Sequence, residues 1–250
     1  MLKDWTRPYY QPNGGDPFLF FVVYGAIDLE SPLSRSAYRS EGIPEGMEIM
    51  HYGAAQADVV SGFREGYLWN RLIESDSELA RQIAEADECV VLRGMPADAT
   101  SLNFLRDVIG LLTHMLDHGG LCVYDPQMLH WWKRETWRDR IFLPDAPVPR
   151  HHAVILDSPE KIDGLAWFHT RGMRKFGRPD LSIHGVPEFR RAAVIDLCNR
   201  FIELQAFGAI VPENQMVQIP ALPEGMTCHH AGDVDDPDFN NVHLEIRWPS

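Results

Sequence analysis

Hydrophobic residues recur along the chain with two different spacings, and each spacing predicts a type of secondary structure. Apolar runs at 18–26, 88–94 and 121–125 predict buried strands. Between the last two runs, apolar residues with helical spacing predict a long amphipathic helix, whose stripe comprises Leu102, Leu105, Val108, Ile109, Leu112, Met115 and Leu116. Strand, helix and strand in this order form one layered unit of sheet and helix.

Polar residues mark the expected beginnings of two helices. Ser75 and Glu78 fit a capping box, in which side chains accept hydrogen bonds from free backbone N–H groups, so a helix is expected to begin there. Thr100 or Ser101 is expected to cap the longer helix. The opposite stripe of this longer helix is polar and comprises Asn103, Arg106, Asp107, Thr113, His114 and Asp117.

The second part of the chain repeats the combination of strands and a long helix. Apolar runs at 152–156, 164–169 and 180–184 predict strands. Strict alternation of apolar and polar residues over 242–248 predicts a strand with one buried face, as in an antiparallel sheet. A helix is expected to start near Pro187, with a buried face made of Phe189, Ala193, Leu197 and Phe201.

These elements predict an α+β fold of mostly antiparallel sheets, with two long amphipathic helices packed on them. Both parts of the chain carry an amphipathic helix between strands, which predicts two structurally similar halves. Pro144, Pro147 and Pro149 favour an exposed connection between them. The expected halves are residues 1–147 and 148–250, either as two domains or as parts of one compact unit.

The charge balance narrows the classes of partner. The 250 residues include 36 acidic and 23 basic side chains, and the formal net charge is −13. This surplus argues against nonspecific nucleic-acid binding and against an anionic membrane surface, because both depend on exposed cations. The most apolar stretch, 18–27, has about half of the ~20 residues that a membrane helix needs, and the first residues lack the apolar core of a targeting signal.

The cysteines indicate a reducing compartment. Cys89, Cys122 and Cys198 lie in apolar runs, and Cys228 is far from all three in sequence. Buried free thiols behave as small hydrophobic groups. We therefore expect reduced, structural cysteines and a cytoplasmic protein.

Strong motifs for nucleotide binding, nucleophilic catalysis or metal binding are absent from the sequence. Adjacent histidines at 151–152 and 229–230 would point to opposite faces of an extended strand, so the two side chains of a pair cannot easily coordinate the same metal ion. The acidic stretch 233–238 has Pro237 and Asp238 where a calcium loop needs other residues. We expect no metal, no cofactor and no stoichiometric transition metal in the purified protein.

A stretch at 131–140 interleaves three tryptophans with four cations. Such residues can stack on bases or sugars. The acidic residues Glu135 and Asp139 partly cancel the local charge, so the favoured interpretation is that the tryptophans anchor a long loop to the core.

Another basic stretch supplies the candidate binding site. If Thr170 caps a short helix, four cations share one face with His169 at its edge, and the site comprises His169, Thr170, Arg171, Arg174, Lys175 and Arg178. Two interpretations stay open: a site for an anion or an acidic partner, and a basic face neutralised internally by residues 233–238 or by Asp180 and Glu188. Internal neutralisation is slightly favoured for Arg171, and an exposed role is expected for Lys175 and Arg178.

The same stretch resembles bacterial domain families of unknown function that carry a Thr-x-Gly and Phe-Gly-x-Pro-Asp/Glu-Leu signature. The resemblance covers about residues 150–250 and extends more loosely over 88–125. It implies a cytoplasmic bacterial α+β domain and brings no assigned activity. The matching positions are Thr170, Gly172, Gly177, Pro179, Asp180 and Leu181.

Two classes of function remain. The first is a soluble intracellular bacterial protein that binds a protein partner or a small anionic ligand, one version being an acidic protein that pairs with a basic partner. The alternative is a hydrolytic small-molecule enzyme that uses His169 and acidic residues of the second half. An enzyme should show a deep pocket with a perturbed histidine, whereas an interaction protein should show a shallow patch with exposed aromatic side chains.

Overall fold

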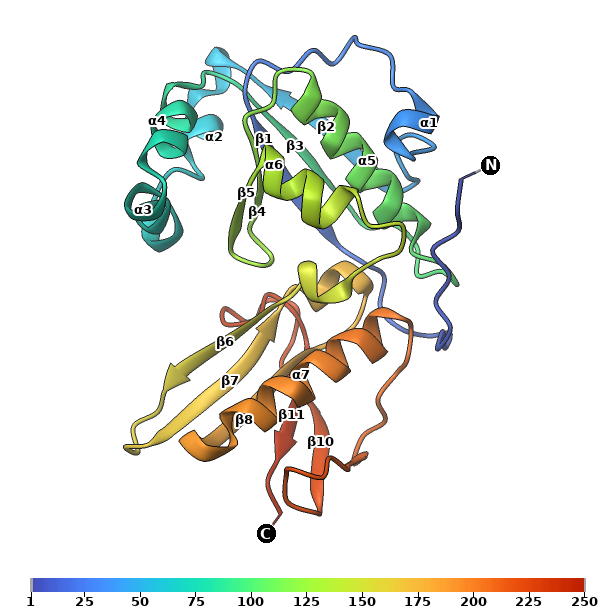
Figure 1. The fold of residues 1–250 in the computed structure, drawn as a ribbon, viewed down its shortest axis with the longest axis vertical. Coiled ribbons are helices and arrows are strands. Elements are labelled where there is room, and N and C mark those ends of the chain that lie inside the picture. The colour runs from blue at the N-terminus through green and yellow to red at the C-terminus, as the bar shows by residue number, and fades with distance from the viewer. Residues whose placement is uncertain (1, 250) are drawn as a thin grey trace. The chain divides into compact units, whose positions relative to one another are not determined.

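The computed structural model describes residues 2–249 and combines helices with two mainly antiparallel sheets, which confirms the α+β class (Figure 1). The described chain packs into two compact units. The first unit comprises residues 2–5, 18–97 and 101–148, and the second comprises 6–17, 98–100 and 149–249. The units therefore differ from the expected halves, because the segments 6–17 and 98–100 pack with the second unit.

The first unit is built on a five-stranded antiparallel sheet in the order β2-β3-β1-β4-β5. Its strands are β1 (Leu19–Tyr24), β2 (Met47–Tyr52), β3 (Cys89–Gly94), β4 (Cys122–Asp125) and β5 (His130–Lys133). Its helices are α1 (Arg35–Tyr38), α2 (Ala57–Ser61), α3 (Gly66–Ser75), α4 (Ser77–Glu85), α5 (Asn103–Asp117) and α6 (Arg134–Trp137).

Helices cover both faces of this sheet, with α3 and α4 on one side and α5 and α6 on the other (Figure 1). Val22 and Tyr24 of β1 pack in one cluster with Leu72 and Leu79 of α3 and α4. On the opposite face, α5 contacts β1 and β4. A strand buried on both faces needs apolar residues at every position, which explains the uninterrupted apolar run at 18–26.

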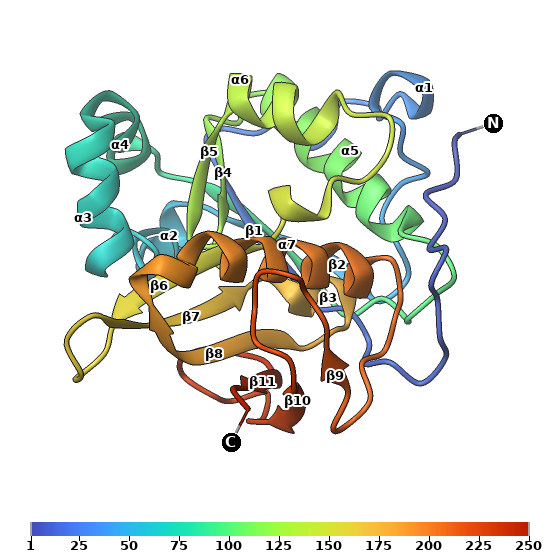
Figure 2. The ribbon, with the colours of Figure 1, turned by 60° about the horizontal axis from the view of Figure 1, so that its bottom comes forward.

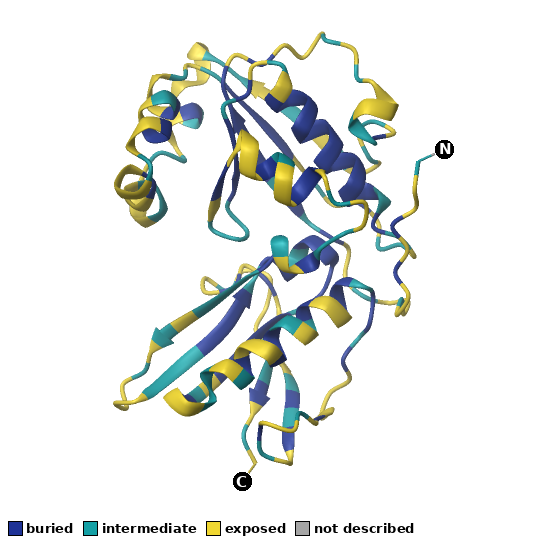
Figure 3. Ribbon diagram, viewed as in Figure 1, coloured by how far each residue is buried: buried dark blue, intermediate teal, exposed yellow. Residues whose placement is uncertain are grey.

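Helix α5 is buried on its polar side as well as on its apolar side (Figure 3). An amphipathic helix usually exposes its polar stripe, but residues from two other segments cover this one. Arg106 donates to the carbonyl of Lys3 at 2.7 Å, and Ser40 donates to the carbonyl of Asp107 at 2.9 Å. The buried members of the polar stripe are Arg106, Asp107, Thr113 and His114.

The expected helix caps are wrong at both positions. Helix α4 begins one residue later than expected, because Asp76, and not Ser75, accepts the hydrogen bond from a backbone N–H of the first turn. Leu102 occupies the cap position of α5, and neither Thr100 nor Ser101 caps it. The free N–H groups of α5 therefore receive no side-chain cap at this position.

The stretch at 131–140 forms β5 and α6 and continues into a short π-helix, Arg138–Phe142, so it is not a loop. Trp131, Trp132 and Trp137 are buried, which confirms that they are anchors. The indole N–H of Trp137 donates to Thr113 Oγ1 at 2.9 Å. This contact helps to explain why a threonine on the polar stripe of α5 is buried.

The second unit has a six-stranded sheet in the order β6-β7-β8-β11-β10-β9, in which only β8 and β11 run parallel. Its elements are β6 (Val154–Pro159), β7 (Leu165–Arg171), β8 (Asp180–Pro187), α7 (Arg191–Ala206), β9 (Met216–Val217), β10 (Met226–Ala231) and β11 (His243–Arg247). Helix α7 lies along one face of this sheet (Figure 2). The two sheets thus differ in strand number and in the presence of a parallel pair.

Helix α7 buries Val194, Leu197 and Cys198 in one cluster with residues of β7, β8 and β11. Phe189 does not belong to this face. It lies in a 3-10 turn before α7 and is 81% exposed, so its expected burial is wrong. The alternation expected for the last strand is confirmed by burial of Leu244 and Ile246 within β11.

A buried charge cluster holds the segments 6–17 and 98–100 in the second unit. Asp98 pairs with Arg7 and, at 3.3 Å, with Arg178. Arg7 also donates to the carbonyl of Ala206, and Arg178 to those of Gly208 and Ala209. Ala206 is the last residue of α7, where a helix lacks internal donors and carries partial negative charge, and Gly208 and Ala209 follow just after it.

Within the described chain no helix is both long and apolar enough to span a membrane. The four cysteines are buried and none of them forms a disulfide. Burial raises the pKa of the Cys122 and Cys198 thiols to about 12. Thiols of this kind are poor nucleophiles at neutral pH.

We expect the substitution Arg7→Met to lower the free energy of unfolding by about 3 kcal/mol, because it leaves buried carbonyl and carboxylate oxygens without a donor. Urea unfolding measures the change. Arg200→Met is the matched control, because Arg200 is exposed and pairs with Asp196 on the surface of α7. Equal midpoints for Arg7→Met and the wild type would contradict the role of the cluster.

We expect Cys122 and Cys198 to resist a thiol reagent in native buffer and to react once urea unfolds the protein, because both side chains are fully buried. Mass spectrometry of the labelled peptides identifies the modified positions. Rapid labelling of either cysteine before unfolding would show that the thiols are accessible.

Candidate functional site

The basic stretch does not form a helix with one charged face. Strand β7 continues to Arg171, and the glycines Gly172 and Gly177, with φ of 113° and 64°, flank a 3-10 helix, Met173–Phe176. Such left-handed φ values favour glycine. Thr170 therefore caps no helix, and the expected common face of the four cations is wrong.

Two of the four cations are buried. Lys175 Nζ donates to the carbonyl of His152 at 2.9 Å, and Arg178 belongs to the charge cluster with Asp98. The exposed role expected for Lys175 and Arg178 is wrong, because backbone carbonyls and a buried carboxylate supply their acceptors. Burial of a cation is tolerated when hydrogen-bond acceptors surround it.

Arg174 contacts the acidic loop, defined here as residues 232–242. Its Nη1 donates to the carbonyl of Asn240 at 2.9 Å. Burial lowers the pKa of Arg174, and the charge of Asp235 opposes this shift. Internal neutralisation by the acidic stretch thus involves Arg174. The charge of Arg171 acts on Asp180, one of the internal partners considered for this basic stretch.

Asp180 is a fully buried carboxyl group at the start of β8. It accepts hydrogen bonds from Thr170 Oγ1 and Asn241 Nδ2, both at 2.8 Å, and from the backbone N–H of Met173 at 3.3 Å. Burial raises its pKa to about 6, although these donors act in the opposite direction. Thr170 therefore orients Asp180 inside the unit and faces no external ligand.

The face of the second sheet that lies opposite α7 carries a row of polar side chains. Phe168, Ile183 and Leu244 point into the cluster with α7, so their strand neighbours point the other way. We call this side the imidazole face, because its strands carry His169, His184, His229 and His243. The cross-strand register aligns Leu156, His169, Ser182, Glu245 and His229 in one row.

Aromatic stacking organises the imidazole face. Trp167 lies between two imidazoles, with ring centroids 4.0 Å from His169 and 5.1 Å from His184. Phe239 of the acidic loop stacks on His243 at 4.2 Å and meets His169 edge-on at 5.6 Å. Phe239 is itself buried, so this side chain attaches the acidic loop to the face.

Three side chains of this face, His169, Arg171 and His243, have a buried nitrogen atom without a hydrogen-bond partner among residues 2–249. His169 is 6% exposed, and its Nδ1 has no hydrogen-bond partner among residues 2–249. Arg171, two residues along β7, has a buried Nε without a partner and forms no ion pair in the described chain. Burial and the nearby charge of Arg171 lower the pKa of His169 to about 4, so its imidazole is neutral at pH 7.

The geometry does not assemble a nucleophilic triad on this face. His169, Ser182 and Glu245 occupy one cross-strand row, but the hydroxyl of Ser182 accepts the indole N–H of Trp167 at 2.9 Å. No hydrogen bond joins Ser182 to His169 within the described residues, and Ser182 is buried. A nucleophile requires a hydrogen-bonded base and access to substrate.

No cluster of three or more potential metal ligands with a suitable arrangement occurs in the region 2–249. His229 instead contacts Glu213 at 2.9 Å, and His230 contacts the carbonyl of Val211 at 2.9 Å. Three cavities, of about 300, 310 and 640 Å³, are lined by other residues than His169. The perturbed histidine therefore belongs to a surface made by a sheet and a loop.

Sequence reasoning selected His169 and Arg171 but missed Trp167, His243 and Phe239. The alternation of polar and apolar residues at 242–248 was a usable signal for His243, because a strand with one buried face presents its polar side chains on the other face. Nothing local predicted Phe239, since its role depends on how the acidic loop folds back.

Comparisons of the whole chain with known proteins find no matching family model, no matching curated protein and no matching solved structure.

We expect Asp180→Asn to gain stability relative to the wild type as the pH rises. The pKa of Asp180 is raised from 3.8 to about 6 in the folded protein, so its contribution is present below pH 3.8 and is lost as the pH rises to about 6. The difference between the two proteins should change by up to about 3 kcal/mol across this window, because each pKa unit corresponds to about 1.4 kcal/mol. Urea unfolding at several pH values tests this, and parallel stability curves would contradict it.

Proposed function

We propose that the protein is a binding protein whose imidazole face recognises an anionic group at Arg171 and His169. The observation that supports this proposal is the buried Nε of Arg171, which has no hydrogen-bond partner among residues 2–249. A buried donor without an acceptor costs about 1–3 kcal/mol. An oxygen anion at this position supplies the acceptor, which is why such unsatisfied groups point to a ligand.

The chemistry of the two side chains suits a carboxylate or a phosphate. A guanidinium presents a planar set of donors that matches both groups. His169 contributes a neutral imidazole, and its stacking on Trp167 holds the ring in one orientation. The group belongs either to a small anionic molecule or to an acidic side chain of a protein partner.

Binding is favoured over hydrolysis for a geometric reason. His169 has a perturbed pKa but no hydrogen bond to Ser182, so no activated nucleophile stands beside it. The aromatic and imidazole side chains instead form a rigid stacked surface around Arg171. Stacked, partly buried aromatic side chains are common at the centres of binding sites.

The wider setting follows from composition and belongs to the same proposal. The net charge of −13 argues against nucleic acid as a partner. Four buried, unpaired cysteines support a cytoplasmic location. The resemblance to bacterial domain families around residues 170–181 supports a bacterial origin, without adding an activity.

Inorganic phosphate is a suitable probe, and the ring resonance of His169 in an NMR pH titration is the readout. A bound anion favours the imidazolium, so phosphate should raise the pKa of His169 above about 4. The variant His169→Gln identifies the resonance. Sodium chloride at matched ionic strength separates specific binding from screening.

Arg171→Gln should abolish the effect of phosphate on His169. Arg247→Gln is the matched control, because Arg247 lies on the same side of the sheet and pairs with Glu245 at 2.7 Å. This control should keep the phosphate-dependent rise. An unchanged pKa of His169 in phosphate, or an equal rise in Arg171→Gln, would contradict the proposal.

A further inference from the structure

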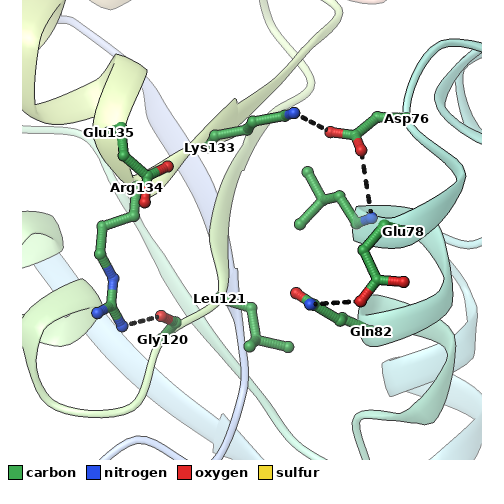
Figure 4. A pocket seen from close by; sticks show the side chains of 9 residues that line it. Asp76, Glu78, Gln82, Gly120, Leu121, Lys133, Arg134 and Glu135 are labelled. Atoms are coloured by element: carbon green, nitrogen blue, oxygen red, sulfur yellow. Dashed lines mark hydrogen bonds and ion pairs between the residues drawn. The ribbon is translucent and has the colours of Figure 1, made fainter.

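The first unit contains a cleft of about 300 Å³ between the start of α4 and the corner where β5 meets α6. Figure 4 shows Arg134 and Glu135 on one side of the cleft, and Glu78 and Gln82 on the other. The ion pair between Lys133 and Asp76 spans the space between the two sides, with a distance of 2.5 Å between Nζ and Oδ2. Its volume lies at the lower end of the range for small-molecule sites.

Two adjacent, solvent-exposed charges of opposite sign in this cleft have no ionic partner among residues 2–249. Arg134 donates only to the carbonyl of Gly120, at 2.8 Å, and Glu135 forms no ion pair within residues 2–249. The remaining charges are already compensated. Lys133 pairs with Asp76, and Glu78 accepts hydrogen bonds from Arg81 and Gln82.

The cleft also has an apolar part. Leu79, on the first turn of α4, is almost completely buried, and Leu121 lies between the two charged sides (Figure 4). A ligand that fits this lining combines an anionic group for Arg134, a cationic group for Glu135 and a short apolar portion for the leucines. Both charged residues begin α6 and line the cleft from the same side (Figure 4).

We propose that this cleft is a binding site for a small zwitterion of the α-amino-acid class. The carboxylate of the ligand contacts the guanidinium of Arg134, its ammonium group contacts the carboxylate of Glu135, and its side chain packs on Leu79 and Leu121. The site is separate from the imidazole face and does not depend on the function proposed there.

Other ligand classes fit the lining less well. A phosphate-rich ligand meets one uncompensated cation and the carboxylates of Asp76, Glu78 and Glu135, so electrostatic repulsion opposes its binding. A purely cationic ligand leaves Arg134 without an anion and places two like charges in one small cleft. A zwitterion satisfies both unpaired charges.

Isothermal titration calorimetry of the full chain with the proteinogenic L-amino acids tests the proposal. At least one amino acid with an apolar side chain should bind, with leucine as the first probe. Two matched analogues isolate the ionic contacts: 4-methylpentanoate lacks the ammonium group, and 3-methylbutylamine lacks the carboxylate. Each analogue should bind at least about tenfold more weakly, which corresponds to about 1.4 kcal/mol of lost binding free energy.

The variants Arg134→Gln and Glu135→Gln should each weaken binding by at least about tenfold. Arg93→Gln is the matched control, because Arg93 is an exposed arginine of the same unit that pairs with Glu48 outside the cleft. Thermal melts verify that each variant is folded. If Arg134→Gln does not fold, Glu135→Gln carries the same test.

Three results would overturn the proposal: no amino acid binds at concentrations up to about 10 mM, the analogues bind as well as leucine, or both cleft variants bind as the control does. Arg134→Gln should keep the phosphate-dependent rise in the pKa of His169, because Arg134 lines the cleft of the first unit and lies outside the imidazole face. Failure of the cleft and failure of the anion site are therefore distinguishable.

Discussion

Asp98 accepts hydrogen bonds from two buried arginines, and the second unit depends on this shared carboxylate. The cluster joins Arg7 of the N-terminal segment, Asp98 of the segment 98–100 and Arg178 beside β8. Arg7 also donates to the carbonyl of Ala206, the last residue of α7, and Arg178 donates to that of Gly208, just beyond the helix. One set of interactions therefore unites three distant parts of the chain and compensates the negative end of a helix.

The cluster also explains why an acidic protein concentrates cations around residue 175. Arg178 and Lys175 donate hydrogen bonds to backbone carbonyls inside the unit, and Arg174 donates to a carbonyl of the acidic loop. Each of these cations has an internal role, so they repel one another less than they would on one exposed helical face. Arg171 differs from them, because its buried Nε has no hydrogen-bond partner among residues 2–249.

The two faces of the second sheet differ in the side chains that they carry. The face toward α7 is a continuous apolar cluster that includes Phe168 and Leu244. The opposite face places imidazoles and Trp167 under the acidic loop, which Phe239 attaches by stacking. In the first unit, by contrast, helices cover both faces of the sheet. The cleft of this unit lies between the start of α4 and the corner where β5 meets α6.

The sequence by itself determined the elements whose signal is local. The run at 88–94, the helical stripe from Leu102 to Leu116 and the alternation within β11 each reflect which side of an element is buried, and periodicity records that directly. The α+β class follows from these elements.

Only the tertiary structure decided the surroundings of the polar groups. The polar stripe of α5 is buried because distant segments cover it, and Lys175 and Arg178 are buried because carbonyls and Asp98 accept their hydrogen bonds. Such partners lie tens of residues away along the chain, so no local spacing encodes them; only folding brings donor and acceptor together.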